Sequence, residues 1–224
     1  MASRGKNNVR VDAEREIDDI KAGLKELGID TAGQTIEKFR TYLDALYSYR
    51  DRMHLLSRRD YERIGRRHFL TSLIAHPYVK DSRRICDVGA GAGFPSLPLK
   101  ILFPEVHFVL FESNRKKAEF LDHLVDMLGL HRIEVINARA EGYSGHGFDL
   151  VLLRAVGKVD RLLKVVQRLL VRGGRAIFFK TQDVEAELRR ASTAISKMGY
   201  GVEVRKIQTP VEKIPMALVI LRKP

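Results

Sequence analysis

A glycine-rich turn between two short apolar runs carries the residue types best suited to binding chemistry. The first run ends at Asp87, and three glycines follow it at alternate positions: Gly89, Gly91 and Gly93. Glycine lets the backbone approach a ligand where any side chain would collide. The second run, 106–111, ends next to Glu112, whose carboxylate can accept hydrogen bonds from ribose hydroxyls. This arrangement favours a nucleoside-binding site at the carboxyl edge of a parallel sheet over the alternative of a plain tight turn.

The spacing of the glycines separates two kinds of nucleoside site. A dinucleotide-binding turn has the pattern G-x-G-x-x-G, in which the third glycine packs the helix against the strand. In this chain Phe94 stands where that third glycine is required. The pattern is instead D-x-G-x-G-x-G, which resembles motif I of the class I S-adenosylmethionine-dependent methyltransferases. The chain also lacks the G-x-x-x-x-G-K-[ST] phosphate loop, which disfavours a nucleotide hydrolase.

Strand and helix patterns alternate from residue 84 onward. Apolar runs predict strands at 84–88, 106–111, 132–137, 148–153, 175–179, 202–207 and 216–221. Helical patterns cover 95–103, 114–128, 158–171 and 183–198, with Ser113 as a helix cap. Because the last two strands have no helix between them, we expect a hairpin with the final strand antiparallel. The predicted fold class is α/β, with the seven-stranded, mostly parallel sheet of the class I methyltransferase (Rossmann-like) topology.

A helical extension is expected before this domain. We expect residues 1–10 to be disordered, 11–77 to form the extension and 78–224 to form the methyltransferase domain. The extension should contain three helices: 12–27, one beginning at Thr31, and one capped by Asp60 and stopped before Pro77. Their apolar side chains at helical spacing are Ile36, Phe39, Leu43, Leu46 and Met53, then Ile64, Phe69, Leu73 and Ile74. These stripes should pack the extension onto the main domain.

The chain is strongly basic, which favours a polyanionic partner. Its 40 lysine and arginine residues exceed its 28 acidic residues and give a formal net charge of +12. Seven arginines lie between residues 50 and 68, more than solubility requires, and the arginine fork suits phosphate groups. This concentration favours nucleic acid over a merely solvated charged face. The single cysteine, Cys86, and the lack of a long apolar run predict a cytoplasmic protein without disulfides or a membrane span.

Further motifs extend beyond the glycine turn. The run from Asp87 to Pro98 reads Asp-Val-Gly-Ala-Gly-Ala-Gly-Phe-Pro-Ser-Leu-Pro. It is followed by Glu112-Ser113, Arg139-Ala140-Glu141, Arg154-Ala155-Val156 and Lys180, and it is preceded by Leu55-Leu56-Ser57 and the run 68–73. Together these motifs resemble the glucose-inhibited division protein B family over roughly residues 35–221. Members of that family are bacterial methyltransferases that modify N7 of a guanine in 16S ribosomal RNA.

The resemblance implies a set of residues around S-adenosylmethionine. These cofactor-binding candidates are Asp87, Gly89, Gly91, Gly93, Phe94, Glu112, Ala140, Glu141 and Arg154. Asp87 would face the methionine ammonium, and Glu112 would hold the ribose. The alternatives are a helix-capping role for Asp87, a core aromatic for Phe94, a solvated strand end for Glu112, a plain turn for Ala140 and Glu141, and a surface ion pair for Arg154.

A second set is implied for RNA, with 16S ribosomal RNA or the small ribosomal subunit as partner. The candidates are Arg58, Arg59, Arg66, Arg67, His68, Arg139 and Lys180. The alternatives are helix packing for His68, a carboxylate partner for Arg139 and a snorkelling side chain for Lys180. No metal site is expected, because the remaining histidines lack ligand spacing: His76, His107, His123, His131 and His146. A monomer is expected.

The implied chemistry needs no catalytic acid or base. Guanine N7 carries an exposed lone pair at neutral pH, so positioning can supply most of the rate. The chain lacks an Asn/Asp-Pro-Pro-Tyr/Phe motif after the fourth strand and a cysteine placed as a nucleophile, which favours a ring-nitrogen acceptor. Two other classes stay open: a non-catalytic RNA-binding protein on this fold, and an NAD-dependent oxidoreductase. The chain departs from the family pattern at Tyr49, Ser57, Thr71 and Thr181.

Overall fold

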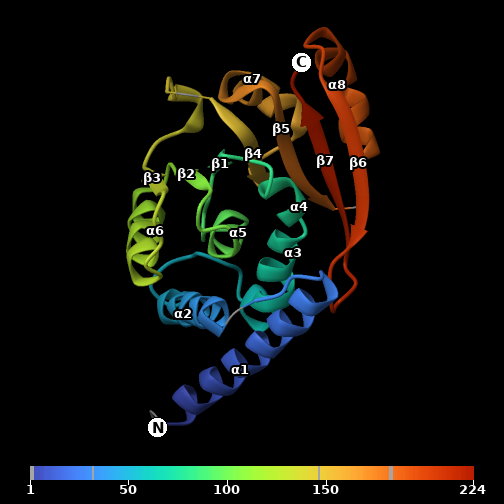
Figure 1. The fold of residues 1–224 in the computed structure, drawn as a ribbon. Coiled ribbons are helices and arrows are strands. Elements are labelled where there is room, and N and C mark those ends of the chain that lie inside the picture. The colour runs from blue at the N-terminus through green and yellow to red at the C-terminus, as the bar shows by residue number, and fades with distance from the viewer. Residues whose placement is uncertain (1–2, 32, 146, 182–183) are drawn as a thin grey trace.

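A seven-stranded sheet forms the centre of the molecule (Figure 1). A computed structural model describes residues 3–31, 33–145, 147–181 and 184–224. The strands are β1 (Arg84–Val88), β2 (His107–Phe111), β3 (Ile133–Ile136), β4 (Phe148–Arg154), β5 (Leu170–Thr181), β6 (Gly201–Gln208) and β7 (Pro215–Arg222). Their order is β3-β2-β1-β4-β5-β7-β6, and only β7 runs antiparallel to its neighbours. The predicted topology, including the final hairpin, is confirmed.

Helices cover both faces of the sheet. One face carries α5 (Ser96–Leu102) and α6 (Arg115–Met127), and the other carries α7 (Val159–Leu169) and α8 (Glu185–Lys197). Consecutive strand residues point to opposite faces. In β1, therefore, Ile85 packs with α5 and α6, whereas Cys86 packs with α7 and α8. The burial of Cys86 agrees with its expected role as a small apolar residue.

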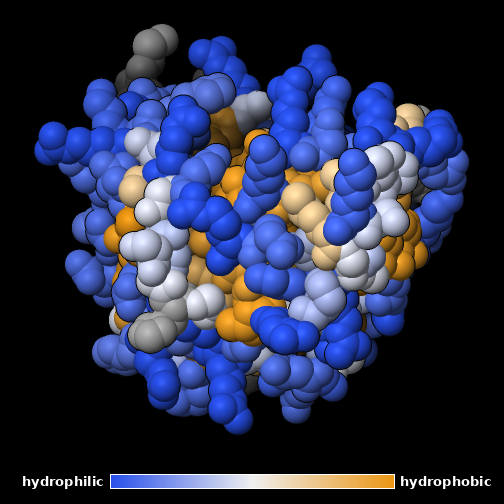
Figure 2. Space-filling view, turned by 90° about the horizontal axis from the view of Figure 1, so that it is seen from above, coloured by the Kyte–Doolittle hydropathy of each residue, from blue (hydrophilic) through white to orange (hydrophobic). Residues whose placement is uncertain are grey.

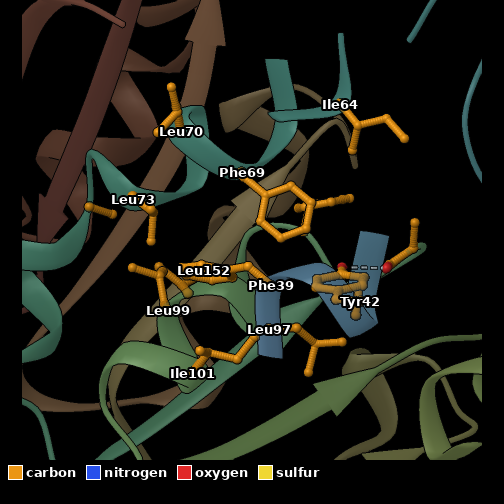
Figure 3. Packing of buried hydrophobic residues seen from close by; sticks show 14 of the residues in the cluster. Phe39, Tyr42, Ile64, Phe69, Leu70, Leu73, Leu97, Leu99, Ile101 and Leu152 are labelled. Atoms are coloured by element: carbon orange, nitrogen blue, oxygen red, sulfur yellow. Dashed lines mark hydrogen bonds between the residues drawn. The ribbon is translucent and has the colours of Figure 1, made fainter. Parts of the chain in front are cut away.

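The N-terminal extension packs on the α5 side of the sheet. Its elements are α1 (Ser3–Glu26), α2 (Gly33–Tyr49), the short helical turns η1 (Asp60–Glu62) and η2 (Gly65–Phe69), α3 (Leu70–Leu73) and α4 (His76–Val79). Figure 3 shows Phe39 and Tyr42 of α2 beside Phe69 of η2 and Leu97 of α5. The ring of Phe69 meets those of Phe39 and Tyr42 edge-on, with centroids 5.5 and 4.9 Å apart. The extension and the sheet thus share one hydrophobic core.

The extension departs from the expected three-helix pattern. α1 begins at Ser3, so residues 3–10 are helical where the sequence predicts disorder. The expected third helix is divided into η1, η2 and α3, and Pro77 lies in the first turn of a further helix, α4. Gly65 N donates to the Glu16 carboxylate of α1 at 2.6 Å, outside the regular helical ladder. This tertiary bond, which no local pattern encodes, coincides with the break.

Several element ends also differ from expectation. Asn114, not Ser113, caps α6, because its Oδ1 accepts a hydrogen bond from Lys117 N at 3.2 Å. β5 begins at Leu170 instead of residue 175, and a register shift opposite Phe148 and Leu150 accommodates the added residues. Met53 is partly buried but lies beyond the end of α2.

Hydrophilic side chains cover most of the face seen in Figure 2, around a central group of apolar ones. In the described ranges, none of the helices combines the length and the apolar composition needed to cross a membrane.

Candidate functional site

The glycine loop and Glu112 meet at the carboxyl ends of β1 and β2. Glu112 is 7% exposed, and its two carboxylate oxygens accept hydrogen bonds from Gly91 N (2.9 Å) and Asn114 N (2.7 Å). The backbone thus fixes the carboxylate against the loop, while further lone pairs of the two oxygens can accept other donors. Gly91 has φ +59°, and a Cβ there would meet only the Gly89 carbonyl oxygen, at 3.8 Å. The surface beside Gly91 is therefore open to a ligand.

The other two glycines of the loop are required by the protein itself. A Cβ at Gly89 (φ +73°) would lie 2.4 Å from Val156 Cγ1, so this glycine makes room for the loop after β4. A Cβ at Gly93 (φ +101°) would lie 2.5 Å from both the Tyr42 hydroxyl and Leu97 Cδ1. Both positions combine a left-handed backbone with close packing, and only glycine satisfies both conditions.

Phe94 lies in the shared core. Its ring stacks on Tyr42 at 5.2 Å with an interplanar angle of 18°, and it meets Phe69 edge-on at 5.2 Å. The His68 ring lies 5.1 Å away, and the Arg154 guanidinium 5.9 Å away. The structure therefore gives Phe94 the core position that was its alternative reading. Its contact with the cofactor stays a prediction.

Asp87 is fully buried beneath the glycine loop. Burial raises the pKa of its carboxyl group to about 7, and the hydroxyl and N–H of Ser96, at the start of α5, partly offset this. Arg154 lowers the pKa of Asp87 further, through its charge. Neither carboxylate oxygen of Asp87 has a partner in full hydrogen-bond geometry among the described residues, and no side chain caps α5, so the helix-capping alternative is not supported. A contact of Asp87 with the methionine ammonium stays a prediction.

Arg154 joins the end of β4 to the N-terminal extension. Its guanidinium donates to the carbonyl oxygens of Arg67 (2.8 Å) and His68 (3.3 Å) and to Ser72 Oγ (3.2 Å). Burial lowers its pKa to about 10. The bonding is therefore not the surface ion pair that was the alternative, because the partners are backbone carbonyls and a hydroxyl.

His68 lies between Arg154 and Asp60. Its Nδ1 is 3.1 Å from Arg154 Nη2, which is always a donor, so Nδ1 must accept and carry no proton. Its Nε2 faces Asp60 Oδ1 at 3.4 Å. Burial lowers the pKa of His68, while the contact with His68 lowers the pKa of Asp60. The Arg154 contact therefore fixes a neutral imidazole in one tautomer, with Nε2 close to Asp60 but not hydrogen-bonded to it. Asp60 does not cap a helix as expected.

A cleft of about 490 Å³ opens beside this group, and we call it the first cleft. It is lined by Asp60, Arg67, His68, Thr71, Arg154, Ala155, Phe179, Lys180, Ile214 and Met216. The sequence predicted four of these as site residues, and the fold brings them together: Arg67, His68, Arg154 and Lys180. Asp60, Ile214 and Met216 were not identified as site residues, because each is placed there only by the tertiary fold.

The remaining candidates are spread over the molecule. Arg66 forms a two-pronged ion pair with Asp19 at 2.7 and 2.8 Å, and Lys180 is held by Glu187 and the Gly157 carbonyl. Arg139 and Glu141 are exposed on either side of buried Ala140, which begins the turn η3 (Ala140–Gly142). Arg58 and Arg59 are exposed, and neither lines the first cleft. Among the described residues, no group of histidine, cysteine or acidic side chains is arranged to hold a metal ion.

The strand order, the antiparallel β7 and the glycine loop after β1 define a class I methyltransferase fold. Solved structures share it: precorrin-6y C5,15-methyltransferase from Geobacter metallireducens GS-15 has a TM-score of 0.52 at 17% identity, covering 76% of this chain and 91% of that one. TYW2 from P. horikoshii, in complex with MeSAdo, has a TM-score of 0.55 at 15% identity, covering 70% of this chain and 62% of that one. At such identities the likeness concerns the fold alone.

Sequence comparison gives the family. The family described as rRNA small subunit methyltransferase G (GidB) matches residues 35–213. The ribosomal RNA small subunit methyltransferase G of Dehalococcoides mccartyi is 38% identical over 208 residues, which cover 90% of this chain and 88% of that protein. The protein of the same name from Bacillus subtilis (strain 168) is 32% identical over 215 residues, covering 92% of this chain and 90% of that protein. The chain belongs to the GidB family.

Proposed function

We propose that the protein transfers a methyl group from S-adenosylmethionine to N7 of a guanine in the 16S RNA of the small ribosomal subunit. The observation that carries the proposal is the hydrogen bond from Gly91 N of the glycine loop to the Glu112 carboxylate. The first cleft, at the ends of β4 and β5, offers a place for the acceptor base. Membership of a family named for methylating small-subunit rRNA supports the acceptor. The protein would act in the cytoplasm, as a monomer.

The residues at the loop fit S-adenosylmethionine. Gly91 leaves open space beside the backbone, and Glu112 offers oxygens that are already oriented, as two ribose hydroxyls require. Ala140 and Glu141, which follow β3, would contact the adenine ring of the cofactor. When bound, S-adenosylmethionine would supply an electrophilic methyl group on its sulfonium sulfur, with S-adenosylhomocysteine as the leaving group.

The first cleft supports the acceptor side. Phe179, Ile214 and Met216 offer apolar surface for a base, and Arg67 adds a guanidinium at the rim, whereas the charge of Lys180 is paired with Glu187. His68 is not needed as a base, because N7 has no proton to lose, and its lowered pKa keeps the imidazole neutral at pH 7. These residues would hold the guanine in line and exclude water, which is how positioning lowers a barrier.

Titration calorimetry with S-adenosylhomocysteine tests the cofactor site. Glu112→Gln replaces one acceptor oxygen by a donor, so the affinity should fall roughly ten- to a hundred-fold. Glu119→Gln is the matched control, since Glu119 is exposed on α6 and pairs with Arg115. Equal affinities of Glu112→Gln and the unsubstituted protein would show that the ribose site is misplaced. Far-ultraviolet circular dichroism should show that both variants are folded.

A further inference from the structure

A second cleft lies in the N-terminal extension, and its lining shares no residue with the first cleft. It has a volume of about 650 Å³, within the range of ligand sites for small molecules. α1 contributes Arg15, α2 contributes Tyr47, and the rest of the lining comes from the segment 50–62. This segment contains several of the closely spaced arginines noted in the sequence, and three of them, Arg50, Arg52 and Arg58, line the second cleft.

Positive charge predominates in this second cleft. Four arginines line it, Arg15, Arg50, Arg52 and Arg58, against two acidic side chains, Asp51 and Glu62. Arg50 reaches Asp51 only at 3.5 Å. Arg58 is exposed, and it forms no ion pair with another residue in the described part of the chain. A cleft with this balance attracts an anion.

Tyr61 gives the second cleft a buried donor. The residue is 9% exposed, and its hydroxyl has no hydrogen-bond partner among the described residues. Burial raises its pKa to about 12, so the hydroxyl keeps its proton and can donate. Its backbone carbonyl accepts from the Tyr47 hydroxyl at 2.9 Å, which fixes the two side by side, with ring centroids 5.9 Å apart. A buried hydroxyl without a partner is uncommon in folded proteins and points to a ligand that accepts a hydrogen bond.

The walls of the second cleft complete the chemical description. Tyr47, Met53 and Leu56 add apolar and aromatic surface next to the arginines. A ligand that matches all of these features has an anionic group, hydrogen-bond acceptors and a flat apolar ring. A nucleotide has all three: its phosphate suits arginine forks, and its base can stack on aromatic or guanidinium surfaces.

We propose that the second cleft binds one nucleotide unit of the RNA substrate, away from the guanine that is methylated. Arg58 and Arg50 contact the phosphate, the Tyr61 hydroxyl donates to a phosphate or ribose oxygen, and the base packs against Tyr47 and Met53. This inference rests on the proposed function, since it takes ribosomal RNA as the partner. It gives the extension a role of its own, which is to hold a second point of the RNA.

A matched pair of variants tests the second cleft. Arg58→Ala and Arg190→Ala remove the same charge from exposed positions, but only Arg58 lines the cleft, and Arg190 is not an RNA-binding candidate. Binding to isolated small ribosomal subunits should weaken about tenfold for Arg58→Ala and at most about twofold for Arg190→Ala. The slope of log affinity against log salt should shrink by about 0.7 to 0.9 for Arg58→Ala. Tyr61→Phe should weaken binding roughly three- to tenfold without loss of fold, because it removes only a hydroxyl that has no partner.

The outcomes separate this inference from its rivals. Equal losses for Arg58→Ala and Arg190→Ala would overturn it in favour of a general effect of surface charge, and so would no loss in either. AMP and inorganic phosphate serve as probes of the ligand, with S-adenosylhomocysteine at saturation to fill the proposed cofactor site. Under that condition, AMP binding that Arg58→Ala weakens and that a single-stranded RNA oligonucleotide does not displace would assign the second cleft to a free nucleotide. Methyl transfer by the unsubstituted protein is measured in parallel. Its absence would remove the proposed function, while the binding comparison would still decide whether the second cleft holds RNA.

Discussion

Arg154 and His68 face each other with two nitrogen atoms, Nη2 and Nδ1, 3.1 Å apart, and Arg154 Nη1 also donates to the His68 carbonyl oxygen at 3.3 Å. The two residues are 86 positions apart in the chain. One belongs to the end of β4 and the other to η2, so this contact holds the extension at the mouth of the first cleft. The imidazole is bound in its neutral form, because Arg154 occupies the acceptor nitrogen.

Arg154→Lys should loosen this junction. A lysine keeps the charge but lacks the planar fork, so it can donate to only some of the acceptors of Arg154, which are two backbone carbonyl oxygens and the Ser72 hydroxyl. We predict a loss of about 2–3 kcal/mol in the free energy of unfolding, measured by urea denaturation. Hydrogen exchange should speed up first at the amides of 67–72. Arg139→Lys, at an exposed position, is the control and should change little. An unchanged urea midpoint in Arg154→Lys would mean that the Arg154 contacts do not help to hold the extension.

Two alanine substitutions in the glycine loop should have opposite consequences. Gly93→Ala forces a Cβ into Tyr42 and Leu97 at φ +101°, so stability should fall by roughly 2–4 kcal/mol. Gly91→Ala meets open space at φ +59°, so the loss of stability should be about 1–2 kcal/mol. Its added methyl group would instead stand in the proposed cofactor site and lower the affinity for S-adenosylhomocysteine by about tenfold or more. Thermal unfolding and calorimetry on both variants check this prediction. The prediction fails if Gly91→Ala binds normally.

The buried carboxyl group of Asp87 should make stability depend on pH. Its pKa is about 7 in the folded protein, above the ordinary value of 3.8, so the folded state keeps a proton that the unfolded chain has lost. Between those two values stability should therefore fall as pH rises, by at most about 1.4 kcal/mol per pH unit, and it should level off above about pH 7. Asp87→Asn cannot titrate. The difference in unfolding free energy between Asp87→Asn and the unsubstituted protein should grow from pH 5 to pH 7 in favour of Asp87→Asn. A constant difference over that range would show that Asp87 is ionised in the folded state.

The sheet could be predicted from sequence because its signals are local. Apolar runs, the glycine turn and the missing helix before β7 each lie within a short stretch, and each of the seven strands overlaps its predicted segment, although β5 begins five residues earlier than expected. The helical extension was harder to predict. The break at Gly65 depends on Glu16 of α1, and the start of α1 at Ser3 is not marked by an apolar stripe.

The candidate site was predictable only in part, for the same reason. The glycines and Glu112 are adjacent through one strand–turn–helix unit, so their meeting follows from the motif. Phe94, by contrast, belongs to the same motif, but its ring packs against Tyr42, which lies in a helix about fifty residues earlier. No local pattern predicts that contact. The sequence predicts contacts with nucleic acid along the arginine-rich stretch, whereas the fold places its arginines in different surroundings. Arg66 pairs with Asp19, Arg67 lines the first cleft, and Arg58 lines the second.

The identity of the methylated atom is the most direct test of the proposed function. The measurement is a quenched single-turnover reaction on isolated small ribosomal subunits at saturating S-adenosylmethionine, with the RNA then digested to nucleosides. We predict 7-methylguanosine as the product, formed at a rate that is nearly flat from about pH 6.5 to 8.5, because N7 is already unprotonated and needs no base. A methyl group on an exocyclic amine or a ribose oxygen, or a rate that rises about tenfold per pH unit, would contradict the proposal.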